Sequence, residues 1–148
     1  GAGQEMGRRA GTENILEIVG MGKACEIARR NLEHNCRHMQ AMRDRLQAGI
    51  TAAVADVRLN GHPDKRLPNT LSLSFRNLEA ASAGAACHAG SVAISHVLKA
   101  MAVPVEWAMG TLRLTTGRMT TAEEIDRAAQ VIGRAADMLK DGSIKSRS

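Results

Sequence analysis

A long run with helical periodicity, from Thr12 to about Gly49, constrains the fold of this chain more than any other feature. Its apolar residues recur mainly at spacings of three and four, which places them along one side of an α-helix. They are Ile15, Leu16, Val19, Ile27, Leu32, Cys36, Met39, Met42 and Leu46. Gly20 and Gly22 interrupt the run, and each weakens a helix by up to about 1 kcal/mol relative to Ala. The pattern predicts two helices or one bent helix, with a break or a close packing contact at the glycines.

Three short segments after this run are typical of β-strands. They are residues 57–61, 70–76 and 111–116, and in the second of them large apolar residues alternate with serines. Prolines and an aspartate between the first two segments give that connection the chemistry of turns. Residues 94–101 are predicted to form a short helix, and residues 103–110 a turn with a helical piece.

The last predicted helix is the clearest element of the sequence. Thr121 and Glu124 have the spacing of a capping box, in which each side chain binds the backbone N–H of the other residue. One face of this helix is apolar, and it consists of Ile125, Ala128, Ala129, Ile132, Ala136 and Leu139. Helices and short strands in this order predict an α+β (α/β) fold, in which helices pack on a short sheet behind a long helical arm.

The formal charge of +5 at pH 7 suggests a nucleic-acid partner, but the rest of the sequence argues against one. The basic residues are interleaved with acidic ones, and one Phe, one Trp and no Tyr leave few side chains on which bases can stack. No apolar run approaches the roughly 20 residues of a membrane span, and the first residues do not form a signal segment. We therefore expect a soluble, cytoplasmic protein with neither nucleic acid nor membrane as a partner.

The cysteines do not predict a disulfide framework or a metal site. Cys25, Cys36 and Cys87 are odd in number and form no CxxC pair, so reduced thiols are expected. His34 and His38 share a face of the predicted helix, but Cys36 projects about 200° away from both. These three residues therefore cannot converge on one ion, and we predict no metal.

Cys87 lies in SAGAACHAG, residues 82–90, a run of the smallest side chains. A nucleophilic cysteine needs access for its target and freedom to move, and small flanking residues provide both. His88 can shift the pKa of the thiol only if the two neighbouring side chains point the same way. By composition alone, the more common alternative is a buried structural cysteine in an Ala-rich turn.

Arg113 and Thr12 are two further candidates for binding. If Leu112 and Leu114 face the core, Arg113 faces the other side of the sheet, where its guanidinium can bind a carboxylate through two parallel hydrogen bonds. The alternative is a surface arginine on an edge strand. Thr12 follows a glycine-rich start and precedes the long helix, so its hydroxyl and nearby backbone N–H groups can bind an anion such as phosphate. The alternative is an ordinary capped helix start.

Four blocks, in this order, resemble the C-terminal part of cysteine desulfurases or selenocysteine lyases, which are class V aminotransferase-like, fold-type I enzymes that use pyridoxal phosphate. The blocks are GQEMGRRAGTEN (3–14), RLPNTLSLSF (66–75), SAGAACHAGS (82–91) and TLRLTTGRMTTAEEID (111–126). The resemblance implies that residues 1–52 are the end of a cofactor domain and a long helical arm. It implies that residues 53–148 are a small C-terminal α+β domain that carries the cysteine loop.

The resemblance also implies a role for each candidate residue. Cys87 corresponds to the cysteine that takes up sulfur as a persulfide, Arg113 to the arginine that binds the substrate carboxylate, and Thr12 to the threonine that reaches the cofactor phosphate of the neighbour in a homodimer. The implied substrate is L-cysteine, or alternatively L-selenocysteine, and the cofactor ring acts as an electron sink. L-Alanine is released, and the sulfur passes to an acceptor protein in iron–sulfur cluster assembly.

Two departures from the family pattern bear on what the chain does alone. The Schiff-base lysine of the family lies in a Ser-x-His-Lys motif, and none of the lysines of this chain does: Lys23, Lys65, Lys99, Lys140 and Lys145. The family also has a helix and a strand of roughly fifteen residues where this chain runs directly through Ala80 and Ala81. We therefore expect the isolated chain to be inactive. The alternative is a non-catalytic fragment that carries sulfur or docks to a partner.

Overall fold

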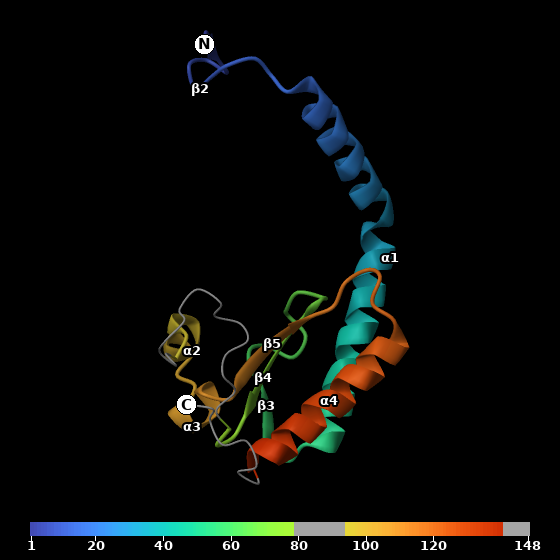
Figure 1. The fold of residues 1–148 in the computed structure, drawn as a ribbon, viewed down its shortest axis with the longest axis vertical. Coiled ribbons are helices and arrows are strands. Elements are labelled where there is room, and N and C mark those ends of the chain that lie inside the picture. The colour runs from blue at the N-terminus through green and yellow to red at the C-terminus, as the bar shows by residue number, and fades with distance from the viewer. Residues whose placement is uncertain (79–93, 141–148) are drawn as a thin grey trace. The chain divides into compact units, whose positions relative to one another are not determined.

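The computed structural model of the 148-residue chain describes residues 1–78 and 94–140 (Figure 1). It divides the chain into two compact units, Gly1–Asn35 and Cys36–Ser148, which are considered in turn. The family resemblance implied a different kind of division, into domains of residues 1–52 and 53–148, which stays a prediction. The boundary between the units lies earlier because the end of the long helix packs into the core of the second unit. The assignment of residues 1–52 to a cofactor domain and its arm stays a prediction.

The long predicted helix is a single element, α1, which spans Ile15–Ala53. It runs without interruption through Gly20 and Gly22, and no atom lies within 4 Å of the position that a Cβ would occupy at either glycine. The predicted break is therefore wrong, because a helix of this length tolerates two weak positions, and the described residues make no close packing contact at either glycine. Helix α1 begins after Asn14, whose side-chain Oδ1 accepts a hydrogen bond from the backbone N–H of Glu17 at 3.3 Å.

The first unit also contains a short hairpin that the sequence analysis did not predict. Strands β1 (Gly3–Gln4) and β2 (Arg9–Ala10) pair antiparallel. Gly11 follows at a φ of 90°, in the left-handed region that glycine adopts without strain. Arg9 then donates to the Glu13 carboxylate at 2.7 Å, which fastens β2 to the segment that leads into α1.

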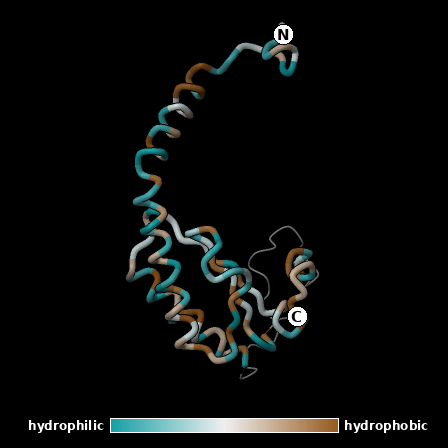
Figure 2. Tube along the Cα trace, turned by 180° about the vertical axis from the view of Figure 1, so that it is seen from behind, coloured by the Kyte–Doolittle hydropathy of each residue, from teal (hydrophilic) through white to brown (hydrophobic). Residues whose placement is uncertain are grey.

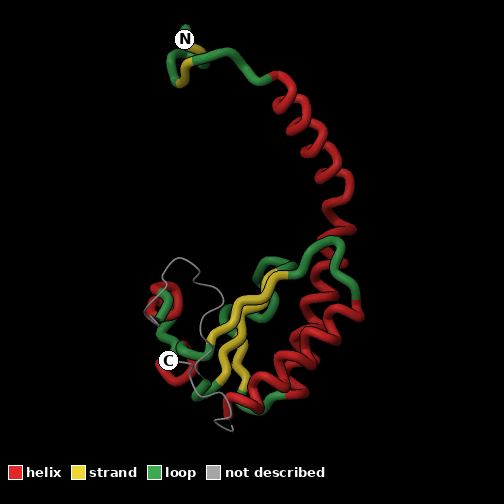
Figure 3. The backbone as a smooth tube through the Cα atoms, viewed as in Figure 1, coloured by secondary structure: helices red, strands yellow, loops and turns green. Residues whose placement is uncertain are grey.

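The second unit contains a three-stranded antiparallel sheet in the order β3-β4-β5, drawn in yellow in Figure 3. The strands are β3 (Val57–Leu59), β4 (Thr70–Phe75) and β5 (Thr111–Thr115). All three predicted strands are confirmed, and each is one or two residues shorter than expected. The antiparallel register places Leu71 opposite Leu114 and Leu73 opposite Leu112, so one face of the sheet is apolar.

The C-terminal half of α1 and helix α4 (Ala122–Lys140) cover this apolar face (Figure 1). The two helices approach closely because small residues meet between them. A Cβ at Gly49 would lie 2.8 Å from the Cβ of Ala129, and one at Gly133 would lie 3.2 Å from the Cβ of Ala53. The buried core consists of Leu46, Ile50, Val54, Leu71, Leu73, Phe75, Leu78, Ile125, Ala129 and Ala136.

Helix α4 begins as the sequence predicts. The backbone N–H of Thr121 donates to Glu124 Oε2 at 2.9 Å, and that of Glu124 donates to Thr121 Oγ1 at 3.3 Å, which is the capping box. The apolar face of the helix is confirmed for the residues that contact the core, whereas Leu139 at its end is exposed.

Two short helices, α2 (His96–Ala100) and α3 (Val105–Ala108), connect β4 to β5 beyond the undescribed residues 79–93. They form a second, smaller apolar cluster from Leu98, Val103, Ala108, Ile94 and Trp107. Helices packed on a short antiparallel sheet confirm the predicted α+β class. In the part of the chain that the structure describes, no helix is long and apolar enough to cross a membrane.

Candidate functional site

Arg113 lies in the middle of β5, directly opposite Ser72 of β4. Its neighbours Leu112 and Leu114 pack against the core, while Arg113 is exposed. The arginine therefore faces away from the core, as the alternation of the strand predicted. Within the described residues it makes no hydrogen bond or ion pair, so its guanidinium is available for a ligand.

The face of the sheet that carries Arg113 is polar, and a chain of hydrogen bonds crosses it. Asn60 Nδ2, just after β3, donates to Ser74 Oγ of β4 at 2.7 Å. Ser74 Oγ in turn lies 2.7 Å from Thr111 Oγ1 of β5, which donates to the Trp107 carbonyl at 3.4 Å. These bonds link the residue that follows β3 to side chains of β4 and β5 and hold the surroundings of Arg113 in one arrangement.

No pattern in the sequence marks Asn60 and Thr111 as members of this face. Ser72 and Ser74 were recognised only as the polar side of one strand. The register with the neighbouring strands would have identified the other two residues, but register depends on contacts between distant segments.

The segment that follows Arg113 is fastened to α1 and to the start of β4. Thr116 is buried, its backbone N–H donates to the Asn69 carbonyl at 2.9 Å, and its hydroxyl donates to the Met39 carbonyl at 3.0 Å. His38 Nε2 donates to the Thr120 carbonyl at 2.9 Å. These bonds fix the C-terminal end of β5 and therefore the position of Arg113 along the sheet.

Thr12 lies in the first unit, exposed between β2 and α1. The cap of α1 is Asn14, so Thr12 is not the capping residue of the helix. Its hydroxyl has no hydrogen bond within the described residues. Gly11, in the left-handed region, directly precedes Thr12, and the exposed hydroxyl of Thr12 can donate a hydrogen bond to an oxygen of an anion.

The three residues singled out by the sequence analysis are not brought together by the described structure. Arg113 and Thr12 belong to different units. Cys87 lies outside the described residues, as does the junction at Ala80 and Ala81. In the described ranges, no group of three His, Cys, Asp or Glu side chains gathers where it could hold a metal ion.

Residues 2–128 match the family Aminotransferase class-V. The chain is 42% identical to "Cysteine desulfurase NifS" of Azotobacter vinelandii over 156 aligned residues, which cover 97% of this chain and 39% of that protein. It is 40% identical to "Cysteine desulfurase IscS" of Methanosarcina thermophila, and that alignment covers 97% of this chain and 38% of the relative. The chain thus spans about two fifths of the length of these relatives.

Two solved structures have a similar fold. One, titled "NIFS-LIKE PROTEIN", has a TM-score of 0.77 and 33% identity, and the match covers 94% of this chain and 38% of the other. A NifS-like protein from Rickettsia africae has a TM-score of 0.76 and 26% identity, with 93% and 39% covered. Both similarities extend over nearly all of this chain.

The length of the alignment can be compared with the prediction that this chain lacks a segment that the family has. The alignment with the Azotobacter protein runs over 156 residues, whereas the whole of this chain has 148. It therefore includes positions at which the relative has a residue and this chain has none. This supports a deletion relative to the relatives, and its location at Ala80 and Ala81 stays a prediction.

Proposed function

The chain belongs to the class-V aminotransferase family, and we propose that it is the C-terminal region of a cysteine desulfurase. In this proposal the chain helps to move sulfur from L-cysteine to Cys87 and to release L-alanine. The observation that carries it is the exposed Arg113 on the polar face of the sheet, in a chain whose relatives are named cysteine desulfurases. The names of the relatives supply the reaction, and Arg113 supplies a group that can bind an amino-acid substrate.

Arg113 binds the carboxylate of the substrate. A guanidinium presents its N–H donors in a planar fork that matches the two oxygens of a carboxylate, so a bidentate pair fixes orientation as well as position. The hydrogen-bonded row from Asn60 to Thr111 keeps the neighbouring surface polar and rigid. A bound carboxylate therefore has one preferred direction relative to β5.

Cys87 accepts the sulfur. Its thiolate attacks the sulfur atom of the substrate, an S–S bond forms, and the bond between that sulfur and the substrate β-carbon breaks. The carbon keeps the electron pair and takes up a proton, which yields L-alanine, while Cys87 becomes a persulfide. The two sulfur atoms of the persulfide together give up two electrons and the β-carbon takes up both, so the step needs no external oxidant or reductant.

Enzymes of this family generally use pyridoxal phosphate, which supplies an electron sink when it is bound. Among the described residues, Thr12 fits the phosphate of this cofactor, because its hydroxyl is exposed and without a partner beside Gly11. We propose that Thr12 donates its hydroxyl hydrogen to a phosphate oxygen of the cofactor held by the neighbouring subunit of a homodimer.

Apolar side chains that are exposed on the first unit support the proposal that another surface covers them. Ile15, Leu16, Val19, Met21 and Leu32 of α1 are all exposed, and Figure 2 shows the brown of apolar residues in the first turns of this helix. Clusters of large exposed apolar side chains mark interaction sites in soluble proteins. We propose that a cofactor domain and a second subunit cover this part of α1.

The remaining parts of the proposal rest on the family alone. They are a sulfur-acceptor protein in iron–sulfur cluster assembly, a cytoplasmic location, and L-selenocysteine as the alternative substrate. The absence of the Schiff-base lysine from this chain and its inactivity in isolation also stay predictions.

The proposal is tested by complementation. This chain is mixed with the lysine-bearing N-terminal part of a cysteine desulfurase, and alanine and persulfide formation from L-cysteine are measured. We expect activity with the unaltered chain and none with Cys87→Ala. With Arg113→Gln we expect kcat/KM to fall on the order of tenfold to a hundredfold, because a charged hydrogen-bonded pair is lost.

Two matched control variants test whether a loss of activity reflects these roles or a disturbed fold. Cys25→Ala removes an exposed thiol, and Arg127→Gln removes an exposed arginine from α4, so both are expected to retain full activity. Failure of the unaltered chain to restore any activity contradicts a desulfurase and favours the non-catalytic fragment. Full persulfide formation by Cys87→Ala contradicts the role of Cys87.

A further inference from the structure

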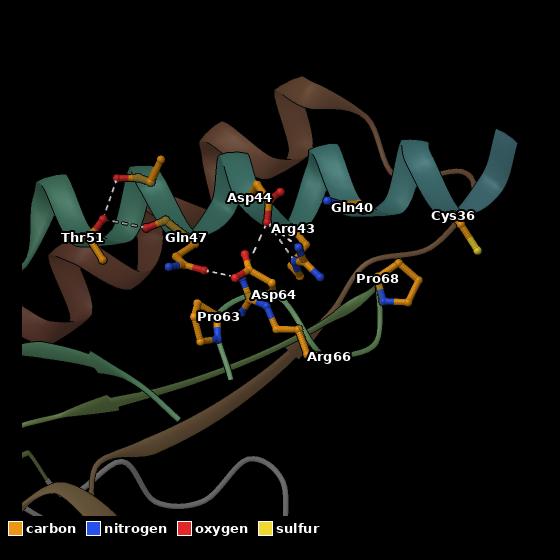
Figure 4. Close-up of a pocket in the computed structure, with 11 residues that line it drawn as sticks. Cys36, Gln40, Arg43, Asp44, Gln47, Thr51, Pro63, Asp64, Arg66 and Pro68 are labelled. Carbon is orange, nitrogen blue, oxygen red and sulfur yellow. Dashed lines mark hydrogen bonds and ion pairs between the residues drawn. The ribbon is translucent and has the colours of Figure 1, made fainter. Parts of the chain in front are cut away.

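A cavity of about 640 Å³ lies between the C-terminal half of α1 and residues 63–68, the segment that leads into β4 (Figure 4). It lies entirely within the second unit. Its size falls in the range of roughly 300–1,000 Å³ that is usual for small-molecule sites. The polar side chains that line it include Gln40, Arg43, Asp44, Gln47, Asp64 and Arg66.

Arg43 forms a fixed wall of this cavity. Its side chain is 5% exposed, and its guanidinium has partners on every nitrogen. Nε and Nη2 donate to Asp44 Oδ1 at 2.9 and 2.7 Å, and Nη1 donates to the Leu67 carbonyl at 2.9 Å. Arg43 therefore tethers the 63–68 segment to α1 and has little capacity left for a ligand.

Arg66 has donors without partners. Its side chain is only 14% exposed, and Nη2 donates to Gln47 Oε1 at 2.8 Å. Nε and Nη1 are buried and have no hydrogen-bond partner among the described residues. Arg66 Nη2 also forms an ion pair with Asp44 Oδ1, but at 3.6 Å the two atoms are too far apart for a hydrogen bond. Buried donors without partners are rare and costly, so an acceptor from outside the described residues is expected here.

The electrostatics around Arg66 point the same way. Burial lowers the pKa of Arg66, and the positive charge of Arg43 lowers it further. The negative charges of Asp44 and Asp64 act in the opposite direction. An additional oxygen acceptor at Nε and Nη1 would replace the hydration that the guanidinium has lost.

The charges that line the cavity identify the kind of ligand. Arg43 and Arg66 are balanced by Asp44 and Asp64, so the lining as a whole is neutral. A simple anion would add an uncompensated negative charge beside two carboxylates. A zwitterion adds none, because its carboxylate can bind Arg66 while its ammonium group binds an aspartate. Asp64 is exposed and can accept hydrogen bonds from an ammonium group, whereas Asp44 Oδ1 already accepts two hydrogen bonds from Arg43.

We propose that this cavity binds a small zwitterion of the α-amino-acid type, with its carboxylate on Arg66 and its ammonium group on Asp64. The ligand completes the hydrogen bonds of Arg66 and closes the gap between α1 and the 63–68 segment. This site is separate from the polar sheet face around Arg113, and the proposal does not depend on the desulfurase assignment.

The test is a titration of the isotopically labelled full chain, followed by amide NMR shifts, with L-alanine, acetate and methylamine as probes. We expect saturable shifts with L-alanine at residues of the cavity wall, and binding at least about fivefold weaker with acetate or methylamine, which each offer half of the ligand's charges. Arg66→Gln is expected to weaken L-alanine binding about tenfold or more, and Arg127→Gln, on the exposed side of α4, to leave it unchanged.

Asp64→Asn is the second variant, because Asp64 is exposed and its replacement leaves the core intact. It is expected to reduce the binding of L-alanine toward that of acetate, and the amide spectrum reports whether each variant is folded. The proposal is overturned if L-alanine gives no saturable shift, if acetate binds as well as L-alanine, or if folded Arg66→Gln binds like the unaltered chain. If Arg66→Gln does not fold, unchanged binding by Asp64→Asn overturns it.

Discussion

The two halves of helix α1 have similar residues and opposite environments. Leu16, in the first unit, is 84% exposed, whereas Ile50, in the second, is fully buried against the sheet and α4. Helical periodicity is present in both halves, but only the C-terminal half has a described surface to pack against. Most helical stability in proteins comes from such packing rather than from intrinsic propensity. The same helical periodicity therefore produces a buried face only where a second surface of the chain packs against it.

The largest expected effect comes from removing a buried side chain of α1. Ile50→Ala leaves a cavity in the core and is expected to lower the free energy of unfolding by about 2–5 kcal/mol. Leu16→Ala removes an exposed side chain and is expected to change it by less than about 0.5 kcal/mol. Urea denaturation followed by circular dichroism measures both. Equal losses for the two variants would mean that Leu16 is packed in the chain as it exists in solution.

Two glycines, one in a packed part of the chain and one in an open part of α1, are expected to differ in the same way. A Cβ at Gly110 would lie 2.1 Å from the Phe75 carbonyl oxygen and 2.8 Å from that of Leu78, so Gly110→Ala forces the β4 and β5 backbones apart. A loss of about 3 kcal/mol is expected. Gly22→Ala adds a Cβ to open space on α1 and is expected to stabilise the helix by up to about 1 kcal/mol. A tolerated Gly110→Ala, shown by an unchanged urea midpoint, would contradict the close approach of these strands.

The caps of α4 and α1 are expected to differ less in their contribution to the free energy of unfolding. Thr121→Ala removes the hydroxyl that caps α4 and is expected to cost about 1 kcal/mol, because α4 packs on the core and its stability contributes to that of the whole unit. Asn14→Ala removes the cap of α1 in the first unit. It is expected to reduce helicity in the first turns while leaving the cooperative urea midpoint nearly unchanged. A midpoint shift as large as that of Thr121→Ala would show that the two units unfold together.

The smallest expected effect is the pH dependence of one exposed ion pair in the second unit. Arg45 Nε and Nη2 donate to the Asp126 carboxylate at 2.7 and 2.6 Å, and these hydrogen bonds hold the pKa of Asp126 below its usual 3.8. Because the folded pKa is depressed, the contribution is present above the usual carboxylate pKa and is lost as the pH falls through the folded value. Both side chains are exposed, so solvent screening keeps the contribution small.

Asp126→Asn is expected to remove this pH dependence, seen as a flatter curve of unfolding midpoint against pH below about pH 4. Asp137→Asn, on an exposed position of the same helix, serves as the matched control and is expected to follow the unaltered chain. A control that flattens the curve as much as Asp126→Asn would mean that general surface charge, rather than this pair, determines the acid dependence.

Local sequence signals determined most of the elements of this protein. Spacings of three and four predicted the helical run of α1 and the apolar face of α4, and Thr121 with Glu124 predicted the start of α4. Short segments typical of strands predicted β3, β4 and β5, with clear alternation in β4. These signals depend on residues that are close in the chain, so they can be recognised without knowledge of the tertiary structure. The same alternation correctly placed Arg113 on the side of the sheet away from the core.

Tertiary structure alone decided which polar residues meet. Arg43 and Arg66 look like ordinary surface arginines in the sequence, yet the packing of the 63–68 segment on α1 buries Arg43, leaves Arg66 only 14% exposed and creates the cavity. Asn60 and Thr111 join one row of hydrogen bonds only because the register aligns three strands. Burial and register depend on contacts between distant segments, and no periodicity within a single segment encodes them.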